Sequence, residues 1–182
     1  MLAIASMFDT TLSDGTTILV RAIRPEDKSL LETGMERLSE RSRRLRFLTA
    51  TNRLSRSQLA YLTEVDGRNH QAWGALINDE PVAVGRFVRG SDDDAEVALT
   101  VVDEWQGRGI GTLLLKVLAT EAEKVGVERF TFVALPENDG IKRLLARFGV
   151  TGEYEDGLLS ASLALGEGSE IRDQKSHLTP DP

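Results

Sequence analysis

The stretch Gln106-Gly107-Arg108-Gly109-Ile110-Gly111-Thr112 decides how the rest of the sequence is interpreted. Its glycines alternate with larger residues, and without Cβ atoms they let backbone N–H groups approach a ligand closely. A strongly amphipathic segment follows, with apolar residues at i, i+3, i+4, i+7 and i+8 from Ile110. This spacing predicts a helix over 110–125, whose N-terminus adds free N–H donors and partial positive charge. The stretch is therefore a candidate cradle for a diphosphate.

Two well-known diphosphate-binding motifs do not fit this loop. A dinucleotide-binding G-x-G-x-x-G counted from Gly107 requires a glycine where the chain has Thr112. A Walker A loop needs Gly-Lys-Ser/Thr after four spacer residues, and the stretch lacks it. On these residues alone, a glycine-rich turn that merely starts the helix remains an alternative.

Composition limits the class of protein. The 182 residues fit a single domain, and the hydrophobic fraction of 41% is typical of globular proteins. The chain has no cysteine and only two histidines, so we expect neither disulfides nor a metal site. The net charge of −7 argues against a nucleic-acid partner. No run approaches the roughly 18 apolar residues of a membrane span, and no signal-peptide pattern is present. We therefore expect a cytoplasmic protein with no membrane partner.

Hydrophobic periodicity predicts a mixed α/β architecture. Strands are expected over 17–23, 71–77, 82–88, 95–102, 129–135 and within 154–165, and helices over 25–38, 40–47, 54–63, 110–125 and 139–148. Hairpin signals imply antiparallel neighbours, whereas the strand–helix–strand unit over 95–135 implies a parallel or splayed pair. We expect an N-terminal extension over 1–16, one domain over 17–165 and a disordered tail over 166–182.

The spacing Gln106-x-x-Gly109-x-Gly111 resembles the Q/R-x-x-G-x-G/A signature of the GNAT superfamily, the acetyl-coenzyme A-dependent N-acetyltransferases. Its surroundings are similar as well: a strand and acidic connector, Val101-Val102-Asp103-Glu104-Trp105, precede the loop, and Pro136-Glu137-Asn138 follows the next strand. The resemblance covers about residues 17–165. The runs 38–47 and 95–97 further resemble the catalytic domain of bacterial protein-lysine acetyltransferases. The resemblance to the GNAT superfamily implies a GNAT-type acyl-CoA N-acyltransferase fold, in which a central mixed sheet is splayed at the cofactor site and flanked by helices.

The resemblance also implies that acetyl-CoA is the acetyl donor. The residues expected to bind it are Leu99, Thr100, Val101, Gln106, Gly107, Arg108, Gly109, Ile110, Gly111, Thr112 and Asn138. A backbone N–H near Val101, exposed where the strand splays or bulges, would polarise the thioester carbonyl. One position departs from the family pattern. Many members place a tyrosine seven residues after the Asn138 position, where it protonates the leaving thiolate, but this chain has Leu145.

Glu96 is the candidate general base. A lysine amine has a pKa of about 10.4, so a group must accept its proton before the amine attacks. Alternation places Glu96 on the same strand face as Ala98 and Thr100. The resemblance implies that a glutamate here acts directly or through water. The alternative is a solvated carboxylate that merely follows the acidic turn Asp92-Asp93-Asp94.

Together these features predict transfer of an acetyl group from acetyl-CoA to a primary amine, of a protein lysine or a small molecule. Without cysteine no acetyl-cysteine can form, so we expect direct attack in a ternary complex. The alternative is a GNAT-like acyl-CoA-binding regulatory module with little catalysis. Seven arginines and one glutamate give the segment Arg37–Arg56 a net charge of +6. This segment is either a binding surface for an acidic partner or phosphate, or a solvated helix face. The sequence is compatible with a homodimer and does not fix the oligomeric state.

Overall fold

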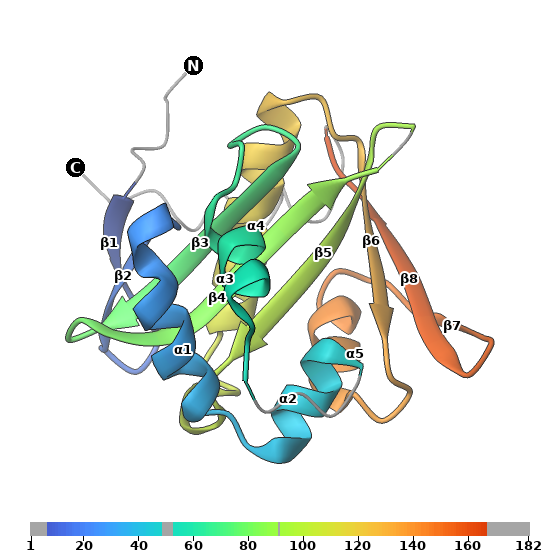
Figure 1. Ribbon diagram of the computed structural model, residues 1–182. Coiled ribbons are helices and arrows are strands. Elements are labelled where there is room, and N and C mark those ends of the chain that lie inside the picture. The colour runs from blue at the N-terminus through green and yellow to red at the C-terminus, as the bar shows by residue number, and fades with distance from the viewer. Residues whose placement is uncertain (1–6, 49–52, 91, 167–182) are drawn as a thin grey trace.

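The computed structural model describes residues 7–48, 53–90 and 92–166, which form one mixed sheet with flanking helices (Figure 1). The strands are β1 (Met7–Thr11), β2 (Thr17–Ala22), β3 (His70–Ile77), β4 (Glu80–Arg89), β5 (Asp94–Val101), β6 (Arg129–Ala134), β7 (Glu153–Glu155) and β8 (Leu158–Ala164). The helices are α1 (Lys28–Glu36), α2 (Glu40–Phe47), α3 (Arg56–Thr63), α4 (Ile110–Lys124) and α5 (Asp139–Ala146), with short 3-10 turns η1 (Pro25–Asp27) and η2 (Asp103–Trp105). The predicted mixed α/β fold is confirmed.

Serine residues cap the N-termini of α2 and α3. Ser39 caps α2 by accepting a hydrogen bond from the Ser42 N–H, and Ser55 caps α3 through the Gln58 N–H. The sequence did not predict β1, which lies within segment 1–16 and pairs antiparallel with β2. Residues 1–6 of the expected extension and 167–182 of the expected tail lie outside the described residues.

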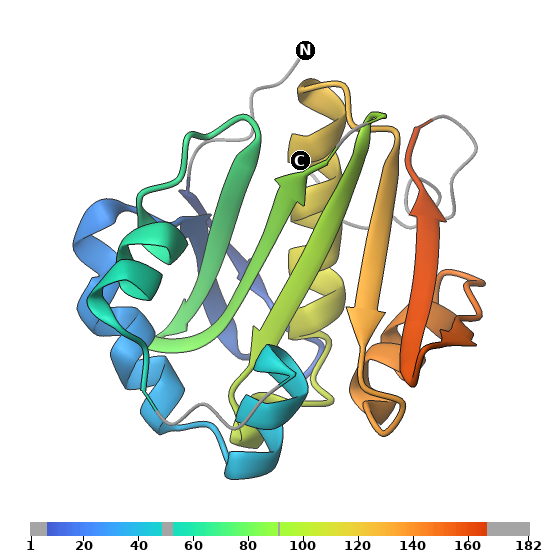
Figure 2. The same ribbon diagram turned by 45° about the vertical axis from the view of Figure 1, so that its right-hand side comes forward.

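The strand order β1-β2-β3-β4-β5-β6-β8-β7 contains one parallel pair, β5 with β6. These two strands pair only where Asp94–Glu96 face Arg129–Thr131. Beyond Glu96 they diverge, while β5 stays paired with β4 as far as Val101 (Figures 1 and 2). The edge of β5 over residues 97–101 therefore has no strand beside it. This is the splayed pair that the sequence predicted.

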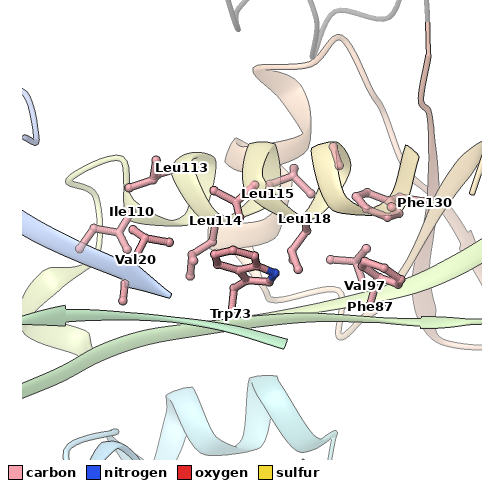
Figure 3. Packing of buried hydrophobic residues seen from close by; sticks show 14 of the residues in the cluster. Val20, Trp73, Phe87, Val97, Ile110, Leu113, Leu114, Leu115, Leu118 and Phe130 are labelled. Carbon is pink, nitrogen blue, oxygen red and sulfur yellow. The ribbon is translucent and has the colours of Figure 1, made fainter. Parts of the chain in front are cut away.

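Helices cover both faces of the sheet. α1, α2 and α3 lie on one face, and α4 and α5 lie on the other (Figures 1 and 2). The core fills the space between α4 and the sheet, where Ile110, Leu113, Leu114, Leu115 and Leu118 pack against Val20, Trp73, Phe87, Val97 and Phe130 (Figure 3). Because this packing anchors α4, it also fixes the glycine-rich loop beside the diverging end of β5.

Gly85 of β4 permits the close approach of α4. A Cβ at this position would lie 2.6 Å from Leu99 Cδ2 and 3.0 Å from Leu118 Cδ1. We expect Gly85→Ala to lower the free energy of unfolding by about 1–3 kcal/mol, because overpacking forces these side chains to shift. Gly34→Ala is the control, since its Cβ would come no closer than 4.0 Å to Pro81, and in α1 it should stabilise by roughly 0.5–1 kcal/mol. Urea denaturation measures the free energy of unfolding of both variants, and an equal change in the two would contradict the assigned role of Gly85.

His70, at the start of β3, makes stability depend on pH. Burial, and then the charge of Arg86, lower the pKa of His70 below its ordinary value of 6.5. Its Nε2 accepts a hydrogen bond from Arg86 Nη1 at 3.1 Å, which requires the neutral ring. Protonation thus favours the unfolded chain, and stability falls as the pH drops below about 6.5 towards the folded-state pKa. His70→Gln should flatten this part of a stability-versus-pH curve measured by urea denaturation; an unchanged slope would contradict the assignment.

Candidate active site

A cleft of about 750 Å³ opens where β5 and β6 diverge. Its walls contain every predicted site residue except one: Glu96, Leu99, Thr100, Val101, Gln106, Gly107, Gly109, Ile110, Gly111, Thr112 and Asn138. The exception is Arg108, which lies outside the lining, forms an ion pair with Asp14 at 3.2 Å and stacks over the Trp105 ring at 4.6 Å. The structure therefore brings together residues that the sequence spreads over more than forty positions.

The glycine-rich loop has the local geometry of a diphosphate cradle. Gly107 and Gly109 have φ angles of +75° and +88°, in the left-handed region that favours glycine. Gly109 is the N-cap of α4, and the first N–H groups of this helix have no partner within it. Gly111 is different, because its φ is ordinary and a Cβ would lie 4.0 Å from Leu144 and Val101. The folded chain alone does not require glycine at position 111, and the loop fits a bound diphosphate.

The N–H of Val101 points into the gap left by β6. The next residue, Val102, donates its N–H to Val82 O on the β4 side at 2.9 Å. Successive N–H groups of a strand point to opposite edges, so that of Val101 points away from β4. Gln106 Nε2 donates to Val101 O at 3.0 Å, on the same edge. The β4–β5 register shows no shift, so strand divergence rather than a bulge exposes this donor.

Glu96 lies at the point of divergence. It is the last β5 residue that pairs with β6, its side chain is exposed, and it lines the cleft. Arg46 of α2 lines the same cleft, and the two charges interact: burial lowers the pKa of Arg46, while the carboxylate of Glu96 opposes this shift. The wall thus carries a solvated carboxylate, a group that can accept a proton, with the cation of Arg46 nearby.

α2 connects the two sides of the cleft. Asp103, just after β5, accepts hydrogen bonds from Ser39 N–H at 3.0 Å, Ser39 Oγ at 2.6 Å and Ser42 Oγ at 2.9 Å. Burial opposes the change, but these bonds lower the pKa of Asp103 from its ordinary value. On the other side, Arg44 pairs with Glu137 at 3.1 Å, in the loop after β6. Sequence reasoning did not find the contact between Ser39 and the distant Asp103.

The arginine-rich segment therefore has several internal partners. Arg37 pairs with Glu80 and Glu104, and Arg41 donates to Glu137 O. Two members of this segment, Arg41 and Arg46, line the cleft, and sequence reasoning did not single out two further arginines of the wall, Arg143 and Arg147. Arg143 lies in α5 and Arg147 is the C-cap of this helix, so their spacing of four residues places them on one side of it, and this spacing was the available signal.

Asn138 lines the cleft at the start of α5, whereas Leu145 within this helix points into the core. Asn138 caps α5, with its Oδ1 accepting the Ile141 N–H at 3.1 Å. Leu145 is 1% exposed and belongs to the core. The tyrosines Tyr61 and Tyr154 are exposed and are absent from the cleft lining. No tyrosine hydroxyl in the described chain is therefore placed to protonate a leaving thiolate in the cleft.

Two further observations concern residues 7–48, 53–90 and 92–166. Within them, His, Asp and Glu side chains form no cluster of three that could hold a metal ion. None of their helices combines the length and apolarity needed to cross a bilayer.

Sequence comparisons relate the chain to acetyltransferases. Residues 33–150 match the acetyltransferase (GNAT) family. The chain is 35% identical over 148 residues to acetyltransferase Pat of Mycolicibacterium smegmatis, covering 78% of this chain and 44% of that protein. It therefore spans less than half the length of that relative. It is 27% identical over 150 residues to acetyltransferase PA5475 of Pseudomonas aeruginosa, covering 80% of this chain and 81% of the relative.

Solved structures agree with this relationship. The GNAT domain of S. lividans PAT superposes with a TM-score of 0.84 at 30% identity, covering 91% of this chain and all of that domain. A cAMP-binding acyltransferase from Mycobacterium smegmatis gives a TM-score of 0.64 at 28% identity, covering 88% of this chain and 47% of that one. The loop signature, the splayed sheet and both comparisons lead to one conclusion: the chain belongs to the GNAT family of acetyltransferases.

Proposed function

We propose that the chain transfers an acetyl group from acetyl-CoA to a primary amine in a ternary complex, with a protein lysine preferred over a small-molecule amine as acceptor. One observation carries the proposal: the glycine-rich loop, the outward N–H of Val101 and the carboxylate of Glu96 line a single cleft. The resemblance of runs 38–47 and 95–97 to bacterial protein-lysine acetyltransferases favours the lysine.

The donor side of the cleft binds and orients the thioester. The diphosphate lies on the N–H groups of the loop and of the first turn of α4. The side chain of Arg108 contacts Asp14 and Trp105 outside the cleft lining, so we assign the diphosphate to backbone N–H groups rather than to this side chain. The N–H of Val101 donates to the thioester carbonyl oxygen and stabilises the negative charge that develops there.

The acceptor side removes a proton. Glu96 accepts it from the substrate ammonium, directly or through one water, and the neutral amine attacks the carbonyl carbon. A C–N bond forms, the C–S bond breaks, and the thiolate leaves with the electron pair of that bond. The nitrogen then loses its second proton, which passes through water to the thiolate and gives the free thiol. The chain has no cysteine to form an acetyl-thioester intermediate, which favours direct attack over a relay.

The test combines coenzyme binding with turnover. Purified protein is assayed for thiol release from acetyl-CoA with lysine peptides and small amines, and calorimetry measures CoA binding. We expect intersecting initial-velocity patterns, acetylated acceptor by mass spectrometry, and no acetylated protein when the acceptor is omitted. Binding without turnover on any acceptor would instead support an acyl-CoA-binding regulatory module, and failure to bind CoA would refute both.

A further inference from the structure

A second, smaller cavity lies on the face of the sheet that bears Glu96. It has a volume of about 70 Å³ and lies between α1, α3 and the strands β3 and β4. Arg86 of β4 lines it and pairs with Ala98 across β4 and β5, so it shares a sheet face with Glu96. The cavity shares Arg46, Phe47 and Thr100 with the larger cleft. It therefore adjoins the acceptor side of the active site.

Arginines interrupt the mostly apolar wall of this cavity. Arg21 is neutralised by Asp27, with both guanidinium nitrogens 2.7 Å from carboxylate oxygens. Arg86 is only 4% exposed, and the acceptors recorded for it, Leu62 O and His70 Nε2, are uncharged. In the described part of the chain, no carboxylate lies within 4.0 Å of Arg86 or Arg46. Buried guanidinium groups are normally paired, because an unpaired buried charge is costly.

The two arginines also repel each other. Burial, and then the like charge of Arg46, lower the pKa of Arg86 to about 9. Arg86 is therefore still protonated at pH 7, and two positive charges adjoin one small cavity. The charge of Glu96 acts on Arg46, but its carboxylate is exposed in the cleft and forms no ion pair with Arg46 within 4.0 Å. An anion between the two guanidinium groups would relieve both the desolvation and the repulsion.

We propose that Arg46 and Arg86 form a subsite for a carboxylate group of the substrate, beside the general base. This inference rests on the proposed function. At about 10–15 Å³ per water-sized group, 70 Å³ holds roughly five non-hydrogen atoms. That is a carboxylate with one or two methylene groups, which suit the apolar walls. The carboxylate comes either from an aspartate or glutamate beside the acceptor lysine or from a dicarboxylic acyl group on the coenzyme.

The first arm of the test measures anion binding without turnover. Succinate is titrated into the full chain at pH 7 by calorimetry, with Arg86→Gln as the test variant. Arg44→Gln is the matched control, because it removes the same charge from an exposed position of α2. We expect saturable binding that Arg86→Gln weakens at least about tenfold, as for loss of a charged hydrogen bond, and that Arg44→Gln leaves unchanged. No binding, or equal binding by all three proteins, overturns the proposal.

A structural role alone would give a different result. If Arg86 serves only to hold Leu62 O and His70, then Arg86→Gln lowers the melting temperature but does not change succinate affinity relative to the control. Circular dichroism checks that the variant is folded. Should Arg86→Gln fail to fold, Arg46→Gln provides the second variant, since Arg46 is half-buried and lies on α2. Succinate affinity unaffected by it would then overturn the proposal.

The second arm identifies the source of the carboxylate. Lysine peptides with aspartate at successive neighbouring positions are compared with asparagine counterparts, and succinyl-CoA is compared with acetyl-CoA. A preference in kcat/KM of about tenfold for an aspartate peptide, abolished by Arg86→Gln while the asparagine peptide is unaffected, assigns it to the acceptor. The same pattern for succinyl-CoA assigns it to the donor. No preference that depends on Arg86 in either pair overturns the subsite. If no acceptor is acetylated, the proposed function fails, while the succinate titration still decides the subsite.

Discussion

Replacing Glu96 by glutamine is expected to lower kcat/KM for acetyl transfer by about 100- to 10,000-fold near pH 7, because an amide cannot accept the proton of the attacking ammonium. Glu96 is exposed and takes part in the sheet only through its backbone. CoA affinity and the free energy of unfolding should therefore stay at the wild-type values. Steady-state thiol release, calorimetry and urea denaturation measure the three quantities separately.

The pH dependence makes this result specific to proton removal. As the pH rises towards the amine pKa of about 10.4, more of the acceptor is already neutral, so the gap between Glu96→Gln and the wild type should narrow. Glu137→Gln is the matched control, because it removes a carboxylate near the cleft that pairs with Arg44 instead. Activity of Glu96→Gln equal to that of the wild type at every pH would rule out Glu96 as the base.

The second large effect is expected from Gly111→Glu. A carboxylate in the first turn of α4 would compete with the diphosphate for the same N–H groups, and juxtaposed like charges cost several kcal/mol. We expect CoA affinity to fall at least about 100-fold. Stability should not fall, because an acidic residue at a helix N-terminus contributes about 0.3–1 kcal/mol. Calorimetry should thus show a lower CoA affinity, whereas thermal denaturation should show a melting temperature equal to or above that of the wild type.

Gly111→Ala serves as its control. The added Cβ would remain 4.0 Å from Leu144 and Val101, and the signature accepts alanine here, so binding and stability should stay close to wild type. Gly109→Ala differs, because its φ of +88° is strained for any residue with a Cβ. If Gly111→Glu binds CoA normally, the diphosphate lies elsewhere and the assignment of the loop is wrong.

Local patterns in the sequence predicted most of the elements. The spacing of apolar residues located α4, and the helices predicted over 40–47 and 54–63 correspond to α2 and α3. β1 was missed because Met7–Thr11 is a short edge strand whose sequence, MFDTT, does not alternate between apolar and polar residues. The sequence Ser13-Asp14-Gly15 has the residue types of a turn and separates β1 from β2, but only the strand after it was predicted. A turn signal between two candidate strands is informative on both sides.

The site could be predicted where its geometry is local and not where it depends on distant contacts. The loop and Glu96 follow from spacing and alternation, and the structure places both in the cleft. The bonds of Asp103 to Ser39 and Ser42, and the position of Arg46 between two cavities, join segments about fifty or more residues apart. No periodicity encodes such pairings. The arginine-rich segment is an example. Its composition indicated either a binding surface or a solvated helix face, but did not predict that Arg41 and Arg44 contact Glu137 after β6.

Because β5 and β6 pair over only a few residues, few backbone contacts join the two parts of the sheet. Three residue pairs join the antiparallel strands β1–β5 to the strands β6, β8 and β7. Much of the remaining connection is the apolar packing of α4 against Phe130 and Phe87 (Figure 3). A ligand that spans this junction contacts both parts of the sheet, and its binding stabilises the folded chain by an amount that grows with the logarithm of its concentration divided by its Kd. The cleft is thus both the place where substrates meet and the junction at which a bound ligand adds contacts between the two parts of the sheet.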